Sequence, residues 1–488
     1  MNLQRGAAAF LKRLLMLFTL CALPLFYYHA SAGPQESHAL PGAVARELKK
    51  AKVPASAVGL YIQPLSAQSK LRPVRFNDKT PYIPASTMKV VTTWTALEIL
   101  GPAHHWKTSA WTSGQQDGDV LKGDLIFKGG GDPDFRLVGF WRFLRQIRAK
   151  GIREIQGDLV LDRSAFEARP FDPAAFDNDP SRPYNAGPDA LLLNHKTLEA
   201  TFTPNPLDGV VQVRFSPELE GIAIIPPTLK DNGACNAWQK AITLHFSEKE
   251  AIFEGAYPLA CGEQTWMLYP YPMSDSAFFG AVFAALWKEL GGSFSGKVRE
   301  GVTPPDASLL AEWISPPLNE IVHTLNKHSN NVMARHVLMA IGSTYLGDPA
   351  TPEKGVAAIR SFLSSQGIPI EGLVIENGSG LSREARISPD TMGGILVAAW
   401  HSAVMPELMA SLPIAGRDGT LARSMRQSSM AGRAHLKTGA IQDVRAIAGY
   451  VLAASGERYA VVFMVNHPNA GAAARARDAL LTWLHDKG

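Results

Sequence analysis

The spacing of apolar residues predicts a strand followed by a helix near the start of the chain. Residues 58–63 form a mostly apolar run that is typical of a buried strand. From residue 86 to residue 100 apolar side chains recur at helical spacing, and Gly101 and Pro102 end the pattern. Ser86 is therefore expected at a helix N-terminus, where free backbone N–H groups and the helix dipole favour developing negative charge.

Residues 101–264 have a different pattern, in which short β-like runs are separated by turn residues. One amphipathic helix is expected at 139–150. Strands are predicted at 124–128, 158–162, 210–215, 222–225 and 242–246. Two of these segments share the tripeptide Gly-Asp-Leu, an echo too short to establish a repeat. We interpret residues 101–264 as one or two inserted β-rich domains.

The helical pattern returns from about residue 265 and continues to the end of the chain. Helices are predicted at 274–290, 318–341, 351–366 and 472–485, and two strands at 444–454 and 458–466. Helices on both sides of an antiparallel sheet give the simplest architecture for this pattern. We therefore predict an α+β fold built from residues 33–100 and 265–488.

The N-terminal residues have the composition of a secretory signal. Three basic residues precede an apolar run at 14–26, and Ala30-Ser31-Ala32 offers a small-residue cleavage site. We predict a cleaved signal peptide at 1–32 and export across the membrane, with an uncleaved anchor as the alternative. Attachment to the cell wall and peripheral association with the membrane stay open.

Composition and charge narrow the function classes. A hydrophobic content of 46% and a charged content of 19% are ordinary for a globular protein. The formal charge of +4 falls to +1 without residues 1–32, which carry three basic and no acidic residues. No long basic run remains, so a nucleic-acid partner is not expected. The length of 488 residues suggests two or three domains.

Two cysteines, Cys235 and Cys261, remain after signal cleavage. In an oxidising compartment two cysteines can pair, and we favour a disulfide that closes a local loop. Two buried free thiols are the alternative.

The tetrad Ser86-Thr87-Met88-Lys89 carries the strongest chemical signal. A serine hydroxyl needs a base within hydrogen-bond reach, and residues three apart share a helix face. Lys89 is therefore placed to deprotonate Ser86, provided that burial or a neighbouring cation lowers its pKa. A Ser-x-x-Lys pattern alone is weak evidence, because composition supplies one or two by chance in a chain of this length.

Two further motifs make the tetrad specific. Ser329-Asn330-Asn331 and Lys437-Thr438-Gly439 each occur once, in the order found in penicillin-recognising serine enzymes. They fall on a helical stretch and on a strand respectively. The sequence has no His-Glu-x-x-His and no Gly-x-Ser-x-Gly, so neither a metal site nor an α/β-hydrolase is expected.

Other segments then narrow the family. The chain resembles the D-alanyl-D-alanine carboxypeptidase/endopeptidase family of class C low-molecular-mass penicillin-binding proteins over about residues 40–485. That family carries a large insertion between its first two motifs, in keeping with the distance from Lys89 to Ser329. The segments that carry the resemblance are 127–133, 184–188, 377–383 and 412–421.

The resemblance implies acyl transfer through a covalent intermediate, with no cofactor. Ser86 attacks a peptidoglycan stem peptide, Lys89 acts as base and Ser329 relays a proton to the leaving amine. Asn331, Lys437, Thr438 and Gly439 bind the substrate, and the N–H groups of Ser86 and Ala440 form the oxyanion hole. β-Lactams are expected as covalent inhibitors of the same serine.

Ala440 is a departure from the resemblance, because the family often has Ser or Thr there. One hydroxyl for the substrate carboxylate is lost, which puts carboxypeptidase efficiency in question. Asp179, Tyr184 and Arg383 fall where relatives bind a diaminopimelate side chain, and ordinary loop stabilisation is the alternative for them.

Two other functions stay open at this point. A β-lactamase would need a deacylating base, and no Glu motif for one is evident. A catalytically weak cell-wall-binding protein would not need three intact motifs. The balance of carboxypeptidase and endopeptidase activity and the oligomeric state are not readable from the sequence.

Overall fold

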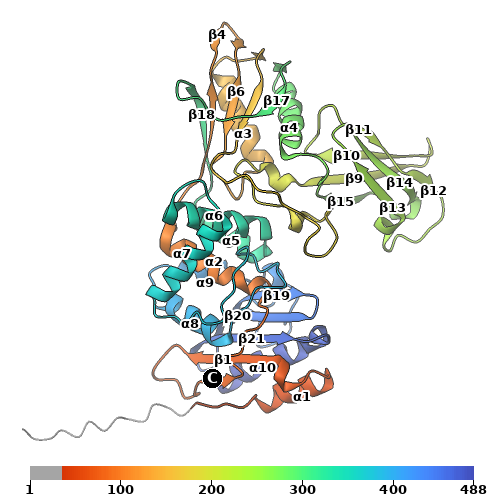
Figure 1. Cartoon of the computed structure of the whole chain (residues 1–488). Helices are drawn as coiled ribbons and strands as arrows, with labels where there is room; N and C mark the ends of the chain where they lie inside the picture. The colour runs from red at the N-terminus through yellow and green to blue at the C-terminus, as the bar shows by residue number, and fades with distance from the viewer. Residues whose placement is uncertain (1–35) are drawn as a thin grey trace, which may run out of the picture. The chain divides into compact units, whose positions relative to one another are not determined.

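The computed structural model describes residues 36–488 (Figure 1). The predicted signal peptide at 1–32 lies outside the described residues. No helix within residues 36–488 is long and apolar enough to cross a membrane.

A five-stranded antiparallel sheet, in the order β19-β20-β21-β1-β2, is the centre of the fold. Its side chains alternate between two buried clusters. On β21, Val462 and Met464 face one cluster, whereas Val461 and Phe463 face the other. Both faces are therefore covered, which explains why β21 is apolar from Tyr459 to Val465. The strands are β1 (Val58–Pro64), β2 (Val74–Phe76), β19 (Ala434–Ile441), β20 (Val444–Leu452) and β21 (Arg458–Asn466).

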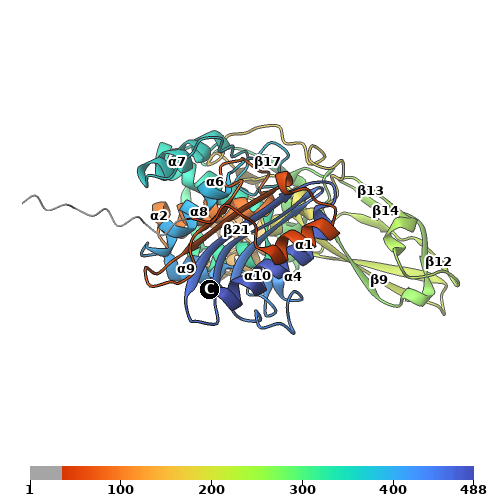
Figure 2. The same ribbon diagram turned by 90° about the horizontal axis from the view of Figure 1, so that it is seen from below.

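Helices cover the two faces of this sheet (Figure 2). Helices α1 (Gly42–Lys50) and α10 (Ala474–Lys487) pack together on one face. The other face carries α2 (Met88–Leu100), α5 (Leu318–His328), α6 (Asn331–Leu346), α7 (Pro352–Ser365), α8 (Pro389–Trp400) and α9 (Met405–Ser411). The predicted α+β class, with an antiparallel sheet between helices, is confirmed.

The motif helix α2 lies inside this all-helical layer. Its residues 88–97 are all buried, and they include Lys89 and three threonines beside the apolar side chains. Trp94 packs edge-on against Phe362 of α7 with ring centroids 5.0 Å apart. Met88 and Lys89, the last two residues of the Ser86 tetrad, thus lie on an element that packs among other helices.

The single helix predicted at 318–341 is wrong, because the chain divides at Ser329. Helix α5 ends at His328, and Ser329 has φ 56° in the left-handed region. Asn330 then caps α6 by accepting a hydrogen bond from the backbone N–H of Met333. The apolar spacing continues through the break, so periodicity gave no sign of it.

The insertion begins after α2, and its first β region has two sheets, in the orders β17-β8-β6-β3-β18 and β16-β7-β5-β4. The two Gly-Asp-Leu segments lie side by side in parallel, with Leu125 opposite Leu159. Their glycines are needed for close backbone approach, since a Cβ on Gly157 would collide with the backbone of Gly123. The strands are β3 (Lys107–Thr112), β4 (Gln115–Asp117), β5 (Val120–Lys122), β6 (Leu125–Lys128), β7 (Glu154–Ile155), β8 (Leu159–Asp162), β16 (Ser293–Phe294), β17 (Val298–Glu300) and β18 (Ser308–Ile314).

The insertion is longer than the predicted 101–264. Helix α4 (Asp275–Glu289) shares a hydrophobic cluster with α3 (Leu137–Ala149), and β18 pairs with β3. Residues 265–314, which the sequence pattern placed with the catalytic domain, therefore pack with the insertion. An amphipathic pattern predicts that one face of a helix is buried, but it does not identify the domain against which that face packs.

A second β region follows within the insertion and has an aromatic core. Phe202 stacks on Tyr257 with an interplanar angle of 7°, and Trp238 packs edge-on against both rings. Cys235 and Cys261 form a disulfide at its edge, with Cα atoms 4.9 Å apart. The strands are β9 (Leu198–Asn205), β10 (Val210–Ser216), β11 (Ala223–Ile225), β12 (Thr228–Lys230), β13 (Ile242–Phe246), β14 (Glu250–Pro258) and β15 (Gln264–Leu268).

Candidate active site

Ser86 lies in a short 3₁₀ turn, Ala85–Thr87, that runs directly into α2. Two glycine segments approach this turn closely. A Cβ on Gly439 would lie 2.5 Å from the carbonyl oxygen of Pro84 and 3.3 Å from the N of Ser86. A Cβ on Gly380 would collide with the carbonyl of Ala85. The third position of Lys-Thr-Gly is therefore a glycine because β19 must run against the turn that carries Ser86.

Lys89 is fully buried and contacts the Ser86 hydroxyl. Its Nζ is 3.0 Å from Ser86 Oγ, 2.6 Å from Asn331 Oδ1 and 2.6 Å from the carbonyl oxygen of Ser379. Burial, followed by the charges of Lys437 and Arg335, holds the pKa of Lys89 well below its ordinary value.

The three contacts orient the amine for proton transfer. A neutral lysine has two N–H donors and one lone pair. The two oxygens of Asn331 and Ser379 can accept both donors, which turns the lone pair toward Ser86 Oγ. The arrangement thus combines a lowered pKa with a fixed direction for a general base.

The other two motifs meet at a second lysine. Lys437 Nζ donates to Ser329 Oγ at 2.8 Å and to the carbonyl of Thr438 at 3.0 Å. Burial lowers the pKa of Lys437 to about 7. The left-handed conformation of Ser329 presents its hydroxyl to β19, which a continuous helix would not do. The structure therefore forms two hydrogen-bonded groups from the three motifs, Ser86–Lys89–Asn331 and Ser329–Lys437, and the charge of Lys437 acts on Lys89.

A loop of the insertion is tied through its backbone to Asn331 and Arg335 of α6. Asn331 Nδ2 donates to the carbonyl of Tyr184 at 3.4 Å, and Arg335 donates to the carbonyls of Tyr184 and Ala186. Burial lowers the pKa of Arg335 to about 10. The loop that carries Asp179 and Tyr184, two of the three predicted pocket residues, is thus held against α6.

Asn330, the middle residue of the second motif, links α6 to a distant histidine. Its Nδ2 lies 3.3 Å from His195 Nδ1, and His195 Nε2 lies 2.8 Å from the carbonyl of Pro133. Burial is the main reason why the pKa of His195 falls to about 3, so this ring is neutral. Its proton is on Nε2, because the Pro133 carbonyl can only accept. Sequence reasoning missed this contact, which joins residues 135 positions apart.

The three residues predicted for a side-chain pocket already have protein partners. Asp179 pairs with Arg182 at 2.6 Å, and the Tyr184 hydroxyl donates to Asp177 at 2.7 Å. Arg383 lies over the ring of Phe176, with its guanidinium carbon 4.9 Å from the ring centroid. Asp179 and Tyr184 share one loop, and Arg383 reaches that loop through Phe176.

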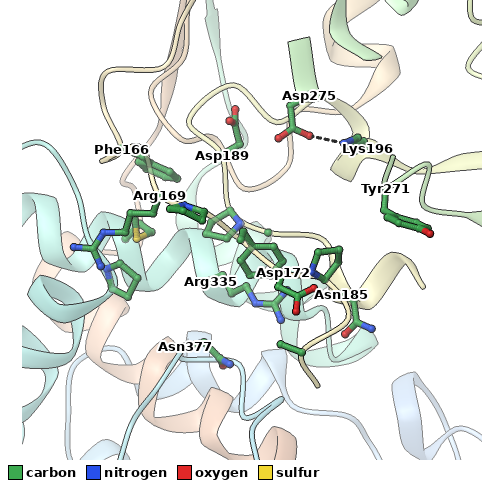
Figure 3. Close-up of a pocket in the computed structure, with 18 of the residues that line it drawn as sticks. Phe166, Arg169, Asp172, Asn185, Asp189, Lys196, Tyr271, Asp275, Arg335 and Asn377 are labelled. Carbon is green, nitrogen blue, oxygen red and sulfur yellow. Dashed lines mark ion pairs between the residues drawn. The ribbon is translucent and has the colours of Figure 1, made fainter. Parts of the chain in front are cut away.

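A cavity of about 1030 Å³ lies between this loop, α6 and residues 376–384 (Figure 3). Arg335 and Asn377 line it on one side. Lys196 and Asp275, which pair at 3.0 Å, line it on another. Phe176 and Arg383 also line the cavity, whereas Ser86 does not. No cluster of three or more potential metal ligands occurs among residues 36–488.

Known proteins resemble the chain over most of its length. The D-alanyl-D-alanine carboxypeptidase DacB of Haemophilus influenzae is 27% identical over 399 residues, covering 81% of this chain and 83% of the relative. The D-alanyl-D-alanine carboxypeptidase of Actinomadura sp. is 29% identical over 425 residues, covering 82% and 76%.

The fold matches a solved structure as well. The crystal structure of penicillin binding protein 4 from Haemophilus influenzae has a TM-score of 0.76 at 25% identity, covering 91% of this chain and 99% of that one. A family model described as D-Ala-D-Ala carboxypeptidase 3 (S13) matches residues 40–487. The family suggested by the three motifs is thereby confirmed, and the chain belongs to the D-Ala-D-Ala carboxypeptidase 3 (S13) family.

Proposed function

We propose that the protein is a serine-type D-Ala-D-Ala carboxypeptidase that also cleaves D-Ala-linked cross-links in peptidoglycan. One observation carries the assignment of roles: the buried Lys89 amine touches Ser86 Oγ while Asn331 and Ser379 accept its two other hydrogen bonds. A lysine with a lowered pKa in this position is suited to activate a serine.

In the acylation step Ser86 Oγ attacks the carbonyl carbon of the scissile D-Ala peptide bond, and its proton passes to Lys89. The N–H groups of Ser86 and Ala440 stabilise the oxyanion. The C–N bond then breaks, and the leaving amine takes the proton from Lys89 by way of Ser329, which leaves Lys89 neutral again. The hydrogen bond from Lys437 to Ser329 supports this relay.

In the deacylation step a water molecule attacks the Ser86 ester. The water gives one proton to the active-site base, and the acyl carbon–oxygen bond breaks to release the shortened peptide. The Ser86 hydroxyl is restored by that proton. Because a β-lactam acylates the same oxygen, we expect it to block this cycle.

Substrate selection would use both the motif strand and the loop of the insertion. Thr438 is half-buried on β19 and available to the terminal carboxylate of the substrate. For a diaminopimelate side chain, Asp179 would hold its amine and Arg383 its carboxylate, with Tyr184 between them. The lowered pKa of Asp179 supports a charged carboxylate there: burial raises it, but hydrogen bonds from Arg182 and Ser181 outweigh that effect.

The proposed site of action is the periplasm, reached by way of the signal peptide at 1–32. The basic residues, the apolar run and the Ala-Ser-Ala sequence support this proposal. A disulfide between Cys235 and Cys261 is in keeping with an oxidising compartment.

Digestion of purified muropeptides tests the function. We expect the wild-type protein to convert pentapeptides to tetrapeptides and cross-linked dimers to monomers, and Ser86→Ala to do neither. Absence of both products with wild-type protein would refute the proposal. Rapid hydrolysis of penicillin without peptide cleavage would favour a β-lactamase instead.

A further inference from the structure

The strand that should bind the substrate carboxylate lacks one hydroxyl, and a neighbouring turn supplies another. Thr438 and Ala440 are two positions apart on β19 and so face the same way. Ala440 is exposed and has no hydroxyl. Thr420 Oγ1, however, lies 2.7 Å from Thr438 Oγ1.

We infer that Thr420 is a specificity-determining residue that binds the free carboxylate of the substrate together with Thr438. This inference rests on the proposed function and deepens it. It assigns a role to a residue outside the three motifs, on the 3₁₀ turn Gly419–Leu421.

The two threonine hydroxyls together keep one proton that is free to donate to a ligand. Each threonine hydroxyl has one O–H and two lone pairs. The bond between Thr420 and Thr438 uses one of the two protons, so the other is free to donate. Thr420 is exposed and Thr438 is half-buried, so an incoming group can reach both oxygens. A carboxylate can accept a charge-assisted hydrogen bond from the free proton, and it accepts one from each hydroxyl once the bond between the two threonines has opened.

Hydrogen bonds from Lys327 and to Asp418 hold the turn that carries Thr420 in place. Lys327 is buried and donates to Asp418 Oδ2 at 2.7 Å and to the carbonyl of Leu412 at 2.7 Å. Asp418 Oδ1 in turn accepts from the backbone N–H of Ile414 at 2.7 Å. The hydroxyl of Thr420 is therefore positioned before substrate arrives, which limits the entropy lost on binding.

Close packing of the turn also explains its glycine. Gly419 has φ 54°, and a Cβ there would lie 2.7 Å from the carbonyl oxygen of Lys327. On the other side, Leu421 is buried in the cluster beneath the sheet. The turn is thus fixed at both ends, and Thr420 is presented at its exposed centre.

The test compares two peptides with the wild-type protein and three variants. One peptide ends in D-Ala-D-Ala with a free carboxylate, and the other ends in D-Ala-D-Ala amide. Thr420→Val removes the hydroxyl with little change of shape, and Thr420→Ser keeps a hydroxyl. Thr420→Val combined with Ala440→Ser restores a hydroxyl at the position that β19 lacks.

We expect Thr420→Val to lower kcat/KM for the free-carboxylate peptide by about 10-fold to 100-fold, the range for a hydrogen bond to a charged group. The loss should be much smaller for the amide peptide. Thr420→Ser and the Ala440→Ser combination should each recover most of the lost activity.

An equal loss with both peptides would overturn the inference, since Thr420 would then only support Thr438. An unchanged kcat/KM in Thr420→Val would overturn it as well. If the wild-type protein cleaved neither peptide, the proposed function itself would fail, and the inference with it. If the wild-type protein cleaves the free-carboxylate peptide and Thr420→Val does not lose activity selectively, the inference fails while the proposed function stands.

Discussion

Replacing Asn330 by Asp separates two contacts that this side chain makes. Asn330 Oδ1 accepts from the backbone N–H of Met333 at 3.0 Å, and an aspartate can do the same. On its other side Nδ2 faces His195 Nδ1 at 3.3 Å. In Asn330→Asp the carboxylate would meet an unprotonated nitrogen, because His195 keeps its proton on Nε2 toward Pro133.

The magnitude follows from the pKa of His195, which burial first of all lowers to about 3. This value lies below the pKa of a histidine in the unfolded chain. The contribution that neutral His195 makes to the stability of the wild-type protein is therefore fully present above about pH 6.5. It is lost as the pH falls toward 3, by about 5 kcal/mol in all. A carboxylate at position 330 should raise the pKa of His195 by about 1 to 3 units.

We therefore expect Asn330→Asp to be less stable than wild type at pH 7.5 by about 1 to 3 kcal/mol, the cost of an unpartnered buried group. The difference should shrink at pH 5, where His195 can take up a proton and pair with the new carboxylate. Arg136 and His336 also face His195 and are unchanged by the substitution. Urea unfolding at the two pH values measures the effect.

Asn330→Ser is the matched control, because serine caps the helix without a charge. Its stability difference from wild type should not depend on pH in this range. The reasoning would be refuted if Asn330→Asp lost the same free energy at both pH values, or if Asn330→Ser showed the same pH dependence.

Two further substitutions test the packing around the site. Gly439→Ala should lower the rate of penicillin acylation by at least about tenfold, because its Cβ would lie 2.5 Å from the Pro84 carbonyl oxygen. The control Gly394→Ala on α8 meets nothing nearer than 3.7 Å and should leave the rate unaltered; equal effects would contradict this account. Cys235→Ser opens a loop between residues 26 apart, which should destabilise the second β region by about 3 to 4 kcal/mol while penicillin acylation persists. Thermal unfolding with and without reductant measures this, and unfolding temperatures that match the wild type would contradict it.

The sequence correctly predicted those helices and strands whose hydrophobic pattern is regular from one end of the element to the other. The β-branched strands at 444–454 and 458–466 and the helix after Ser86 were placed within a few residues. The break at Ser329 was not, because a left-handed serine lacks the glycine or proline that normally marks such a site. The end of the insertion was misplaced because the packing partner of α4 is set by tertiary structure.

The motifs identified side chains whose chemistry is distinctive, such as Ser86, Lys89 and Lys437. They could not identify the Ser379 carbonyl that orients Lys89, since every residue has a backbone carbonyl. The contacts of Asn330 with His195 and of Thr420 with Thr438 join distant or inconspicuous residues. Such contacts depend on the fold and have no local sequence signal.

The most direct test of the central claim is the site of covalent modification by penicillin. Incubation followed by intact-mass measurement and peptide mapping should show one adduct on wild-type protein, located on Ser86. Ser86→Ala should form no adduct, and Lys89→Met should form it far more slowly, because the base is lost while the bulk of the side chain is kept. An adduct on another residue, or one that persists in Ser86→Ala, would contradict the account.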